Sequence, residues 1–538
     1  MAVFSCTLLS VKKLFFKLDK KCESNLEMII LWFVTLILRI PNFFEPYWYG
    51  DEAIYLTLGV GLRNGLKLYT DIIDHKTPLI YYLAMVPNQF YFRLLNFFWM
   101  MVTTALFFSF AKKLFKDSTK AFIGSLIFVL LTTLPWLEGH IPNGELFVMG
   151  FVMVGLTFLS KTALFKHFFD KNSEDALVKN EKKETLWLIV SGIFMGLGIL
   201  TKVPALLDFG AAALIGWFAL SDLIIQKTKD LKEKTNLFKK FITKSLTLFA
   251  GVMLPIIGSI VYFVAIGSGK DYLDYGLLYN IRYSGSWQPD FPSAFVGSLF
   301  SLPGKALIMI TIVLALSFAR KKLSPVFKFA AGWFILALFA SILSNRPYPH
   351  YLLQVVPAFA LLVPIIISNI GKIKTKFREV FLGSFLIALS AYVVLVLGVK
   401  PYSTSEYYSQ FFRFVSGEIT NEEYDHSFNF LVKDNYDVAK IISETGTDRI
   451  FIWGTNPMLY ALSQTTPTSR FTVSFHIKDF KDHARTLNQI KEEEPRIIVV
   501  MKDEYEEFTG LESYLDANYY SNDTQFETMT VYLRQNTN

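Results

Sequence analysis

Residues 28–40 read MIILWFVTLILRI, and this apolar run predicts the first of many membrane-spanning helices. A helix needs roughly 20 predominantly apolar residues to cross the hydrocarbon core of a bilayer. Such runs recur along the chain of 538 residues, of which 52% are hydrophobic and 18% charged, with a mean hydropathy of +0.36. The runs are continuous rather than alternating, which favours helices over a β-barrel. The sequence therefore predicts an α-helical polytopic membrane protein.

Basic residues orient the predicted spans, because loops rich in Lys and Arg stay in the cytoplasm. The N-terminal segment 1–25 contains VKKLFFKLDKK and is predicted to be cytoplasmic. Each predicted inner loop carries a Lys/Arg cluster, so the net charge of +7 needs no nucleic acid to explain it. We predict about 11 spans, roughly at residues 26–41, 93–111, 120–136, 146–161, 186–201, 204–221, 245–266, 294–318, 327–343, 352–369 and 380–399.

The last part of the chain has a different character. Residues 26–399 form the predicted transmembrane domain, with a first outer loop at 42–92, whereas apolar spans stop in residues 400–538. Short β-like runs appear there, RIFIWG at 449–454 and RIIVVM at 496–501, with helix-like stretches between them. We expect a small extracytoplasmic α/β domain, within the usual size range of domains. The predicted location is the cell membrane, multi-pass, with the N-terminus in the cytoplasm.

The first outer loop begins with PYWYGDEAIYLTLG, residues 46–59, which places Asp51 and Glu52 just beyond the first span. Acids this close to a membrane are costly unless they are solvated or paired, so they are candidates for function. The alternative is that they only cap the helix that follows. Lys76 lies further along the same loop, where a lone lysine usually extends its amine to the interface. A cation facing carboxylates across one loop is what handling a phosphorylated substrate requires.

The chemistry that this inventory supports is sugar transfer from a lipid phosphate. Phosphate departs as a stabilised anion, so no general acid is needed. One carboxylate must take the proton of the attacking hydroxyl, and cations must hold the departing charge. One base without a second nucleophile implies an inverting single displacement.

Other polar residues fall at the same predicted outer face, and each also has a structural interpretation. Lys202 suits an interfacial anchor as well as a substrate contact, and "YNIRYSGSW" suits an interfacial belt as well as a lid over a headgroup. "EGHIPNGE" lacks strict metal-site spacing, so the metal stays unknown, although a divalent metal ion is left open. These residues are Asp74, His75, Glu138, His140, Glu145, Lys202, Arg282, Arg346 and His350.

Four stretches, GDEAIY, GLKLYTDIIDHKTPLIYYL, GLGILTKVPALL and RPYPHYLLQVVPAFALL, resemble the C-type, multi-span glycosyltransferases of the protein O-mannosyltransferase superfamily. The likeness covers roughly residues 26–400 and favours the bacterial branch (family 39), which is related to the transferases that add aminoarabinose to lipid A. The resemblance implies a C-type glycosyltransferase fold, a mannosyltransferase-like activity in the cell envelope and a polyprenyl-phosphate-linked sugar as donor. The acceptor it implies is a protein, a lipid or a polysaccharide.

The resemblance also implies roles for individual residues. The family's catalytic acid matches Asp51, with Glu52 its neighbour, and the lysine that contacts the lipid phosphate matches Lys76. Asp74, His75 and Tyr55 belong to the same motif and are taken as substrate-binding, although His75 replaces the acid of the aminoarabinose branch and so puts a carried-over metal site in doubt. Glu145 best matches the acid of the second outer loop, with Glu138 behind it. Lys202, Arg282, Arg346 and His350 are the remaining substrate-binding candidates.

Two other classes of function remain open from the sequence. A transporter or flippase for a lipid-linked precursor would also have 11 spans, but transporter sites lie near the membrane midplane. The predicted mid-span regions carry almost no charge, with Asp208 the main exception. An inactive scaffold whose outer domain binds a surface polymer is the second alternative.

Overall fold

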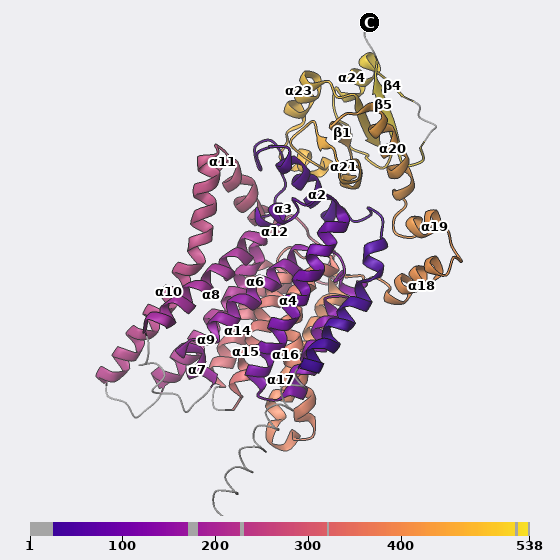
Figure 1. Ribbon diagram of the computed structural model, residues 1–538. Helices are drawn as coiled ribbons and strands as arrows, with labels where there is room; N and C mark the ends of the chain where they lie inside the picture. The colour runs from indigo at the N-terminus through magenta and orange to yellow at the C-terminus, as the bar shows by residue number, and fades with distance from the viewer. Residues whose placement is uncertain (1–24, 170–180, 226–230, 320–321, 522–525, 536–538) are drawn as a thin grey trace, which may run out of the picture.

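A computed structural model describes residues 25–169, 181–225, 231–319, 322–521 and 526–535 (Figure 1). Long helices form a bundle, and a smaller α/β domain covers one end of it. The first helix covers residues 25–39 and is followed by the 3-10 turn η1 (Pro41–Phe44). The other bundle helices are α4 (Gln89–Phe115), α5 (Ser118–Leu131), α6 (Gly144–Leu159), α7 (Ala163–Phe169), α8 (Glu181–Thr201), α9 (Leu206–Ile225), α10 (Leu231–Ala265), α13 (Ala294–Phe300), α14 (Leu302–Phe318), α15 (Pro325–Ser341), α16 (Val356–Ile370) and α17 (Ile373–Val396).

The predicted spans all coincide with helices of this bundle. In the described part of the chain, seven helices are long and apolar enough to cross a membrane, or nine if the bent pairs α6–α7 and α13–α14 each count as one span. Two more predicted spans fall on shorter apolar helices, α5 with 14 residues and α15 with 17. The multi-pass helical architecture is confirmed, while the exact number of spans and the side on which each end lies stay predictions.

Local sequence explains where several helices begin and how closely they pack. Asp117 accepts a hydrogen bond from the Lys120 backbone at the start of α5, and Ser324 caps α15. In α8, Gly192 and Gly196 face α10, where a Cβ on Gly192 would lie 2.3 Å from the Leu248 carbonyl oxygen. Small residues spaced in this way let membrane helices approach closely, so α8 and α10 pack backbone to backbone.

Short elements gather at the end of the bundle that faces the C-terminal domain (Figure 1). The first loop contributes α2 (Gly50–Arg63) and α3 (Leu79–Leu83). Ile54 and Leu58, four residues apart, lie buried on one face of α2. The remaining elements at this end are η2 (Pro135–Leu137), η4 (Val203–Ala205), α11 (Gly269–Asp271), the π-helix η5 (Tyr272–Leu278), α12 (Tyr279–Gly285) and η6 (Pro349–Val355).

The C-terminal region contains a five-stranded sheet in the order β2-β1-β3-β5-β4. The two β-like runs of the sequence form β1 (Arg449–Trp453) and β3 (Ile497–Met501), which pair in parallel, while β5 (Met529–Arg534) pairs antiparallel with β3 and with β4 (Tyr519–Ser521). β2 (Thr466–Pro467) flanks β1. The helices are α18 (Thr404–Val415), α19 (Asn421–His426), α20 (Val432–Thr445), α21 (Pro457–Ser463), α22 (Ser474–Asp479), α23 (His483–Glu493) and α24 (Leu511–Asn518).

One hydrophobic core joins the first loop to the C-terminal domain. Leu58 of α2 and Ile80 of α3 belong to the same buried cluster as Ile452 and Leu459 of the domain. The backbone N–H of Ile73 also donates to the Arg470 carbonyl at 2.7 Å. Burial of shared apolar surface is the main stabilising contribution to such a junction, so the domain holds the first loop against the bundle.

Candidate functional site

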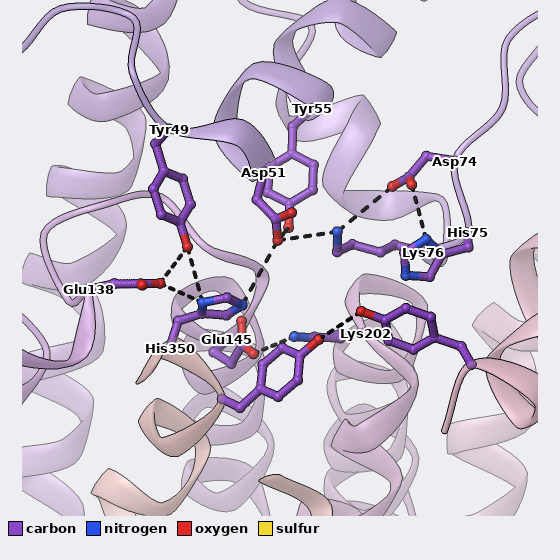
Figure 2. Close-up of polar contacts among 12 residues, drawn as sticks. Tyr49, Asp51, Tyr55, Asp74, His75, Lys76, Glu138, Glu145, Lys202 and His350 are labelled. Carbon is purple, nitrogen blue, oxygen red and sulfur yellow. Dashed lines mark hydrogen bonds and ion pairs between the residues drawn. The ribbon is translucent and has the colours of Figure 1, made fainter. Parts of the chain in front are cut away.

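Asp51 and Lys76 meet at the junction of the bundle and the domain. Asp51 is in the first turn of α2, and Lys76 is in the loop before α3; Lys76 Nζ lies 3.3 Å from Asp51 Oδ2 and 3.8 Å from Asp74 Oδ2 (Figure 2). The Tyr55 hydroxyl donates to Asp51 Oδ2 at 3.2 Å, and Lys76 Nζ lies 5.0 Å from the centre of the Tyr55 ring. The Asp51 side chain is 28% exposed, against 10% for Lys76 and 0% for Asp74, so Asp51 is the most accessible of the three charged groups.

The charges of this pair hold each other ionised. Burial by itself raises the pKa of Asp51, but Lys76, followed by His350 and Lys202, lowers that pKa below its usual value. Burial lowers the pKa of Lys76, yet Asp51 and Tyr55 outweigh it and keep that pKa well above its ordinary value. At neutral pH the site therefore presents a carboxylate beside an ammonium group.

Glu52, the neighbour of Asp51, points into a different environment. Its two carboxylate oxygens accept hydrogen bonds from Arg93 on α4 at 2.9 and 2.8 Å, and one also accepts from Gln89 at 3.1 Å. The side chain is 1% exposed. Successive residues of a helix project about 100° apart, which explains why one acid of the pair faces the site and the other lies in a buried ion pair.

A second acid approaches Asp51 through a histidine. His350 Nε2 lies 3.9 Å from Asp51 Oδ2, and His350 Nδ1 contacts Glu138 (Figure 2). The Tyr49 hydroxyl donates to Glu138 and lies 3.1 Å from His350 Nδ1. Glu138 follows η2 in the left-handed backbone region, with φ 57°. Glu138, which the resemblance placed behind Glu145, is thus linked to Asp51 through His350. Tyr49, which the sequence did not single out, belongs to the same group of contacts.

A cavity of about 90 Å³ lies beside Lys76. Lys202 lines it, pairs with Glu145, and has its Nζ 4.3 Å from the centre of the Tyr351 ring. The Tyr351 hydroxyl is in turn 3.3 Å from that of Tyr283. The other polar residues of the lining are His75, Thr77, Asn280, Ser284, Ser341, Ser344 and Gln354.

Two of the predicted basic residues stand outside this lining. Arg346 stacks on Tyr283, with the guanidinium carbon 4.4 Å from the ring centre, and donates to Ser286 at 3.0 Å. Arg282 is exposed on α12. Tyr283 and Tyr351 were not singled out from the sequence, because tyrosines in outer loops are common in membrane proteins.

Three side chains come together where the first loop meets α22. His75 Nδ1 lies 3.1 Å from Asp74 Oδ1, and His476 Nε2 lies 3.5 Å from the same oxygen. All three residues are buried, and the candidate ligand atoms lie within 4.8 Å of one another. Burial lowers the pKa of His476 to about 3, so its imidazole is neutral. Two imidazoles and a carboxylate are a donor set that fits a divalent metal such as Zn²⁺. His476 lies far along the chain, and no sequence signal connected it with the loop.

Comparison with known proteins supports the resemblance read from the sequence. Residues 75–265 match the family described as dolichyl-phosphate-mannose-protein mannosyltransferase. No curated protein matches the chain. ArnT from Cupriavidus metallidurans, in its apo crystal structure, has a similar fold, with a TM-score of 0.51 and 13% identity over 96% of this chain and 97% of that one.

Two structures of an oligosaccharyltransferase from Archaeoglobus fulgidus are also similar. The apo form has a TM-score of 0.47 and 10% identity, over 89% of this chain and 69% of that one. AglB with an inhibitory peptide and a dolichol-phosphate has a TM-score of 0.43 and 12% identity, over 90% and 70%. The C-type glycosyltransferase fold predicted from the sequence is confirmed by the likeness to ArnT, and the family match supports a membrane-embedded glycosyltransferase.

Proposed function

We propose that this protein transfers a monosaccharide from a polyprenyl-phosphate donor to an acceptor hydroxyl on the outer face of the membrane, with inversion at the sugar carbon. The observation that carries this proposal is the 3.3 Å contact between Asp51 and Lys76 beside a cavity that also holds Lys202. A carboxylate and two ammonium groups are what a displacement at a lipid-phosphate sugar requires. The matched family is itself described by a dolichyl-phosphate-linked sugar donor.

In the proposed reaction Asp51 accepts the proton of the acceptor hydroxyl. The acceptor oxygen forms a bond to the anomeric carbon on one face, while the bond from that carbon to the phosphate oxygen breaks on the other. Lys76 and Lys202 hold the phosphate as its negative charge grows, which is the contribution that preorganised cations make to a transition state. The ammonium group of Lys76 has three N–H donors, so one can contact Asp51, as in the structure, while another binds the phosphate.

His350 has a position from which it can influence the charge of Asp51. Its Nδ1 contacts Glu138 and Tyr49, whereas its Nε2 has no hydrogen-bond partner in the described part of the chain and faces Asp51 at 3.9 Å. A hydrogen bond at one ring nitrogen fixes the role of the other. Burial lowers the pKa of His350, but Glu138 and Glu145 outweigh it and raise that pKa above its ordinary value. We assign to His350 the role of a positive neighbour that keeps the Asp51 carboxylate ionised.

A divalent metal ion, if bound, would be held by Asp74, His75 and His476. It would supply positive charge beside Lys76 and a cross-link between the first loop and the C-terminal domain. Asp74 Oδ1 lies 3.1 Å from His75 Nδ1 and 3.5 Å from His476 Nε2, so these three atoms would be the ligands. No step of the proposed reaction depends on this ion.

The transporter alternative gains little from the structure. Asp208, in α9, accepts hydrogen bonds from Trp333 and Gln354, each at 2.7 Å, and is 2% exposed. A carboxylate satisfied by two neutral donors within packed helices is placed for structure rather than for ion passage.

The test is transfer of label from radiolabelled polyprenyl-phosphate sugars by membranes that contain the wild type, Asp51→Asn or Asp71→Asn. Asp71 is an exposed acid of the same loop and serves as the matched control. We expect label on an acceptor with the wild type and with Asp71→Asn, and none with Asp51→Asn at equal amounts of folded protein. Equal transfer by all three proteins would remove Asp51 from the mechanism and bring the transporter and scaffold alternatives forward.

A further inference from the structure

A second cavity, of about 180 Å³, lies where Trp48 meets residues 402–428. It shares no lining residue with the cavity that holds Lys76 and Lys202. Aromatic rings form much of its wall: Trp48 lies 5.9 Å from Tyr402 and 5.6 Å from Phe428, measured between ring centres. Tyr407 completes this aromatic group.

Polar groups in the same lining are left with unused hydrogen-bonding capacity. His140 is 1% exposed, and its Nδ1 has no hydrogen-bond partner within the described residues. Buried polar atoms are nearly always paired, so an unpaired one calls for a partner. Glu406 lies exposed in the first turn of α18. The cavity thus offers a ligand a ring nitrogen of His140, the carboxylate of Glu406 and several aromatic faces.

This cavity is close to the proposed base. Trp48 precedes Asp51 by three residues, so their Cα atoms lie within about 11 Å of each other. The centres of the Trp48 and Tyr49 rings lie 5.4 Å apart, and the Tyr49 hydroxyl contacts both Glu138 and His350. His350 Nε2 in turn faces Asp51. A molecule in the cavity is therefore separated from the reacting centre by a few side chains.

We propose that this cavity is a saccharide-binding subsite, which makes the acceptor of the proposed transferase a carbohydrate rather than a protein side chain. The inference rests on the proposed function and names its second substrate class. Aromatic faces pack against the apolar C–H faces of a sugar ring, and a few placed polar groups bind its hydroxyls. The lining holds no Lys or Arg for an acidic peptide and no strand edge along which an extended peptide could pair. The cavity binds one unit of the acceptor, and another unit of the same saccharide carries the reacting hydroxyl to Asp51. That hydroxyl loses its proton to Asp51 as its oxygen bonds to the anomeric carbon and the bond from that carbon to the phosphate oxygen breaks.

The experiment uses the radiolabelled donors with membranes containing wild type, Tyr402→Ala or Glu406→Gln. Matched controls are Tyr520→Ala and Glu418→Gln, an exposed tyrosine and an exposed glutamate outside the cavity. Labelled product is treated with protease and then hydrolysed partially with acid, so that label on protein separates from label on a saccharide. Donor turnover is followed in parallel by release of polyprenyl phosphate.

We expect protease-resistant product that yields a labelled disaccharide. Tyr402→Ala and Glu406→Gln should each lower transfer at limiting acceptor roughly two- to tenfold, the effect of losing one hydrogen bond or ring contact. The KM for the donor should stay unchanged. Label on amino acids or on a lipid without sugar, or equal transfer by cavity variants and controls, overturns the subsite. Absence of Asp51-dependent transfer in every membrane would instead overturn the proposed function.

Discussion

Arg93 donates two hydrogen bonds to Glu52, and this buried ion pair places Glu52 in surroundings different from those of its neighbour Asp51. Asp51 is left 28% exposed beside Lys76, whereas the Glu52 side chain is 1% exposed. Glu45 also approaches Arg93, at 3.3 Å. The pair Asp51–Glu52 therefore consists of one partly exposed acid, the base of the proposed reaction, and one acid in a buried ion pair.

Glu52→Gln is expected to lower stability while leaving the activity of each folded molecule close to wild type. Loss of one partner from a buried ion pair leaves an uncompensated charge and costs about 3–5 kcal/mol, although Glu45 would compensate Arg93 in part. Thermal unfolding in lipid nanodiscs measures the first effect, and transfer per folded molecule the second. Lost transfer at unchanged thermal stability would show that Glu52 takes part in the reaction.

Lys76→Met is expected to weaken use of the donor. The variant removes an ammonium group that holds the departing phosphate in the proposed reaction, and removal of one such donor costs roughly 10²–10³-fold in rate. Steady-state transfer over a range of donor concentrations measures the loss, with Lys67→Met, an exposed lysine of the same loop, as control. A variant as active as that control would exclude Lys76 from phosphate binding.

The same variant should change the acid limb of the pH–rate profile. Lys76 is the largest of the charges that lower the pKa of Asp51, and burial opposes it by raising that pKa. Without the lysine the pKa rises, so residual activity of Lys76→Met should fall at a higher pH than wild-type activity as the medium is acidified. Coincident acid limbs would indicate that another group titrates.

Removal of metal should affect the junction between the first loop and the domain. If Asp74, His75 and His476 hold an ion, a strong chelator lowers thermal stability in the wild type but not in His476→Ala, and elemental analysis finds metal in the wild type alone. His483→Ala, a partly exposed histidine outside the cluster, is the control. A metal-free wild type that is indifferent to chelator would assign the cluster to hydrogen bonding only.

The free energy of unfolding should decrease as the pH falls, because His140 is buried in its neutral form. Burial lowers the pKa of this imidazole to about 4, whereas an unfolded histidine titrates near ~6.5. Between these values the unfolded chain binds a proton that the folded chain does not, so stability decreases as pH falls from about 6.5 towards 4. Thermal unfolding at several pH values should show a shallower decline for His140→Gln; identical slopes would contradict the assignment.

Much of the fold follows from local sequence. The apolar run at 28–40 and its successors are long enough to satisfy their own backbone hydrogen bonds within a bilayer, so each predicts a helix without knowledge of its neighbours. The runs at 449–454 and 496–501 likewise predicted β1 and β3. Asp51 and Lys76 were paired from one loop, because a single short segment carries both residues.

The tertiary structure alone decided which side chains share an environment. Arg93 on α4 pairs with Glu52, and Glu138 after η2 contacts His350 before α16. His476 of the C-terminal domain meets His75 of the first loop, 401 positions away in the sequence. These contacts depend on how separate helices and the domain pack, and packing is set by shared burial rather than by any local pattern. The sequence by itself determined a membrane bundle with an acid and a lysine in its first loop, and only the packing of distant segments decided which acid stays partly exposed beside that lysine and which is held in the core.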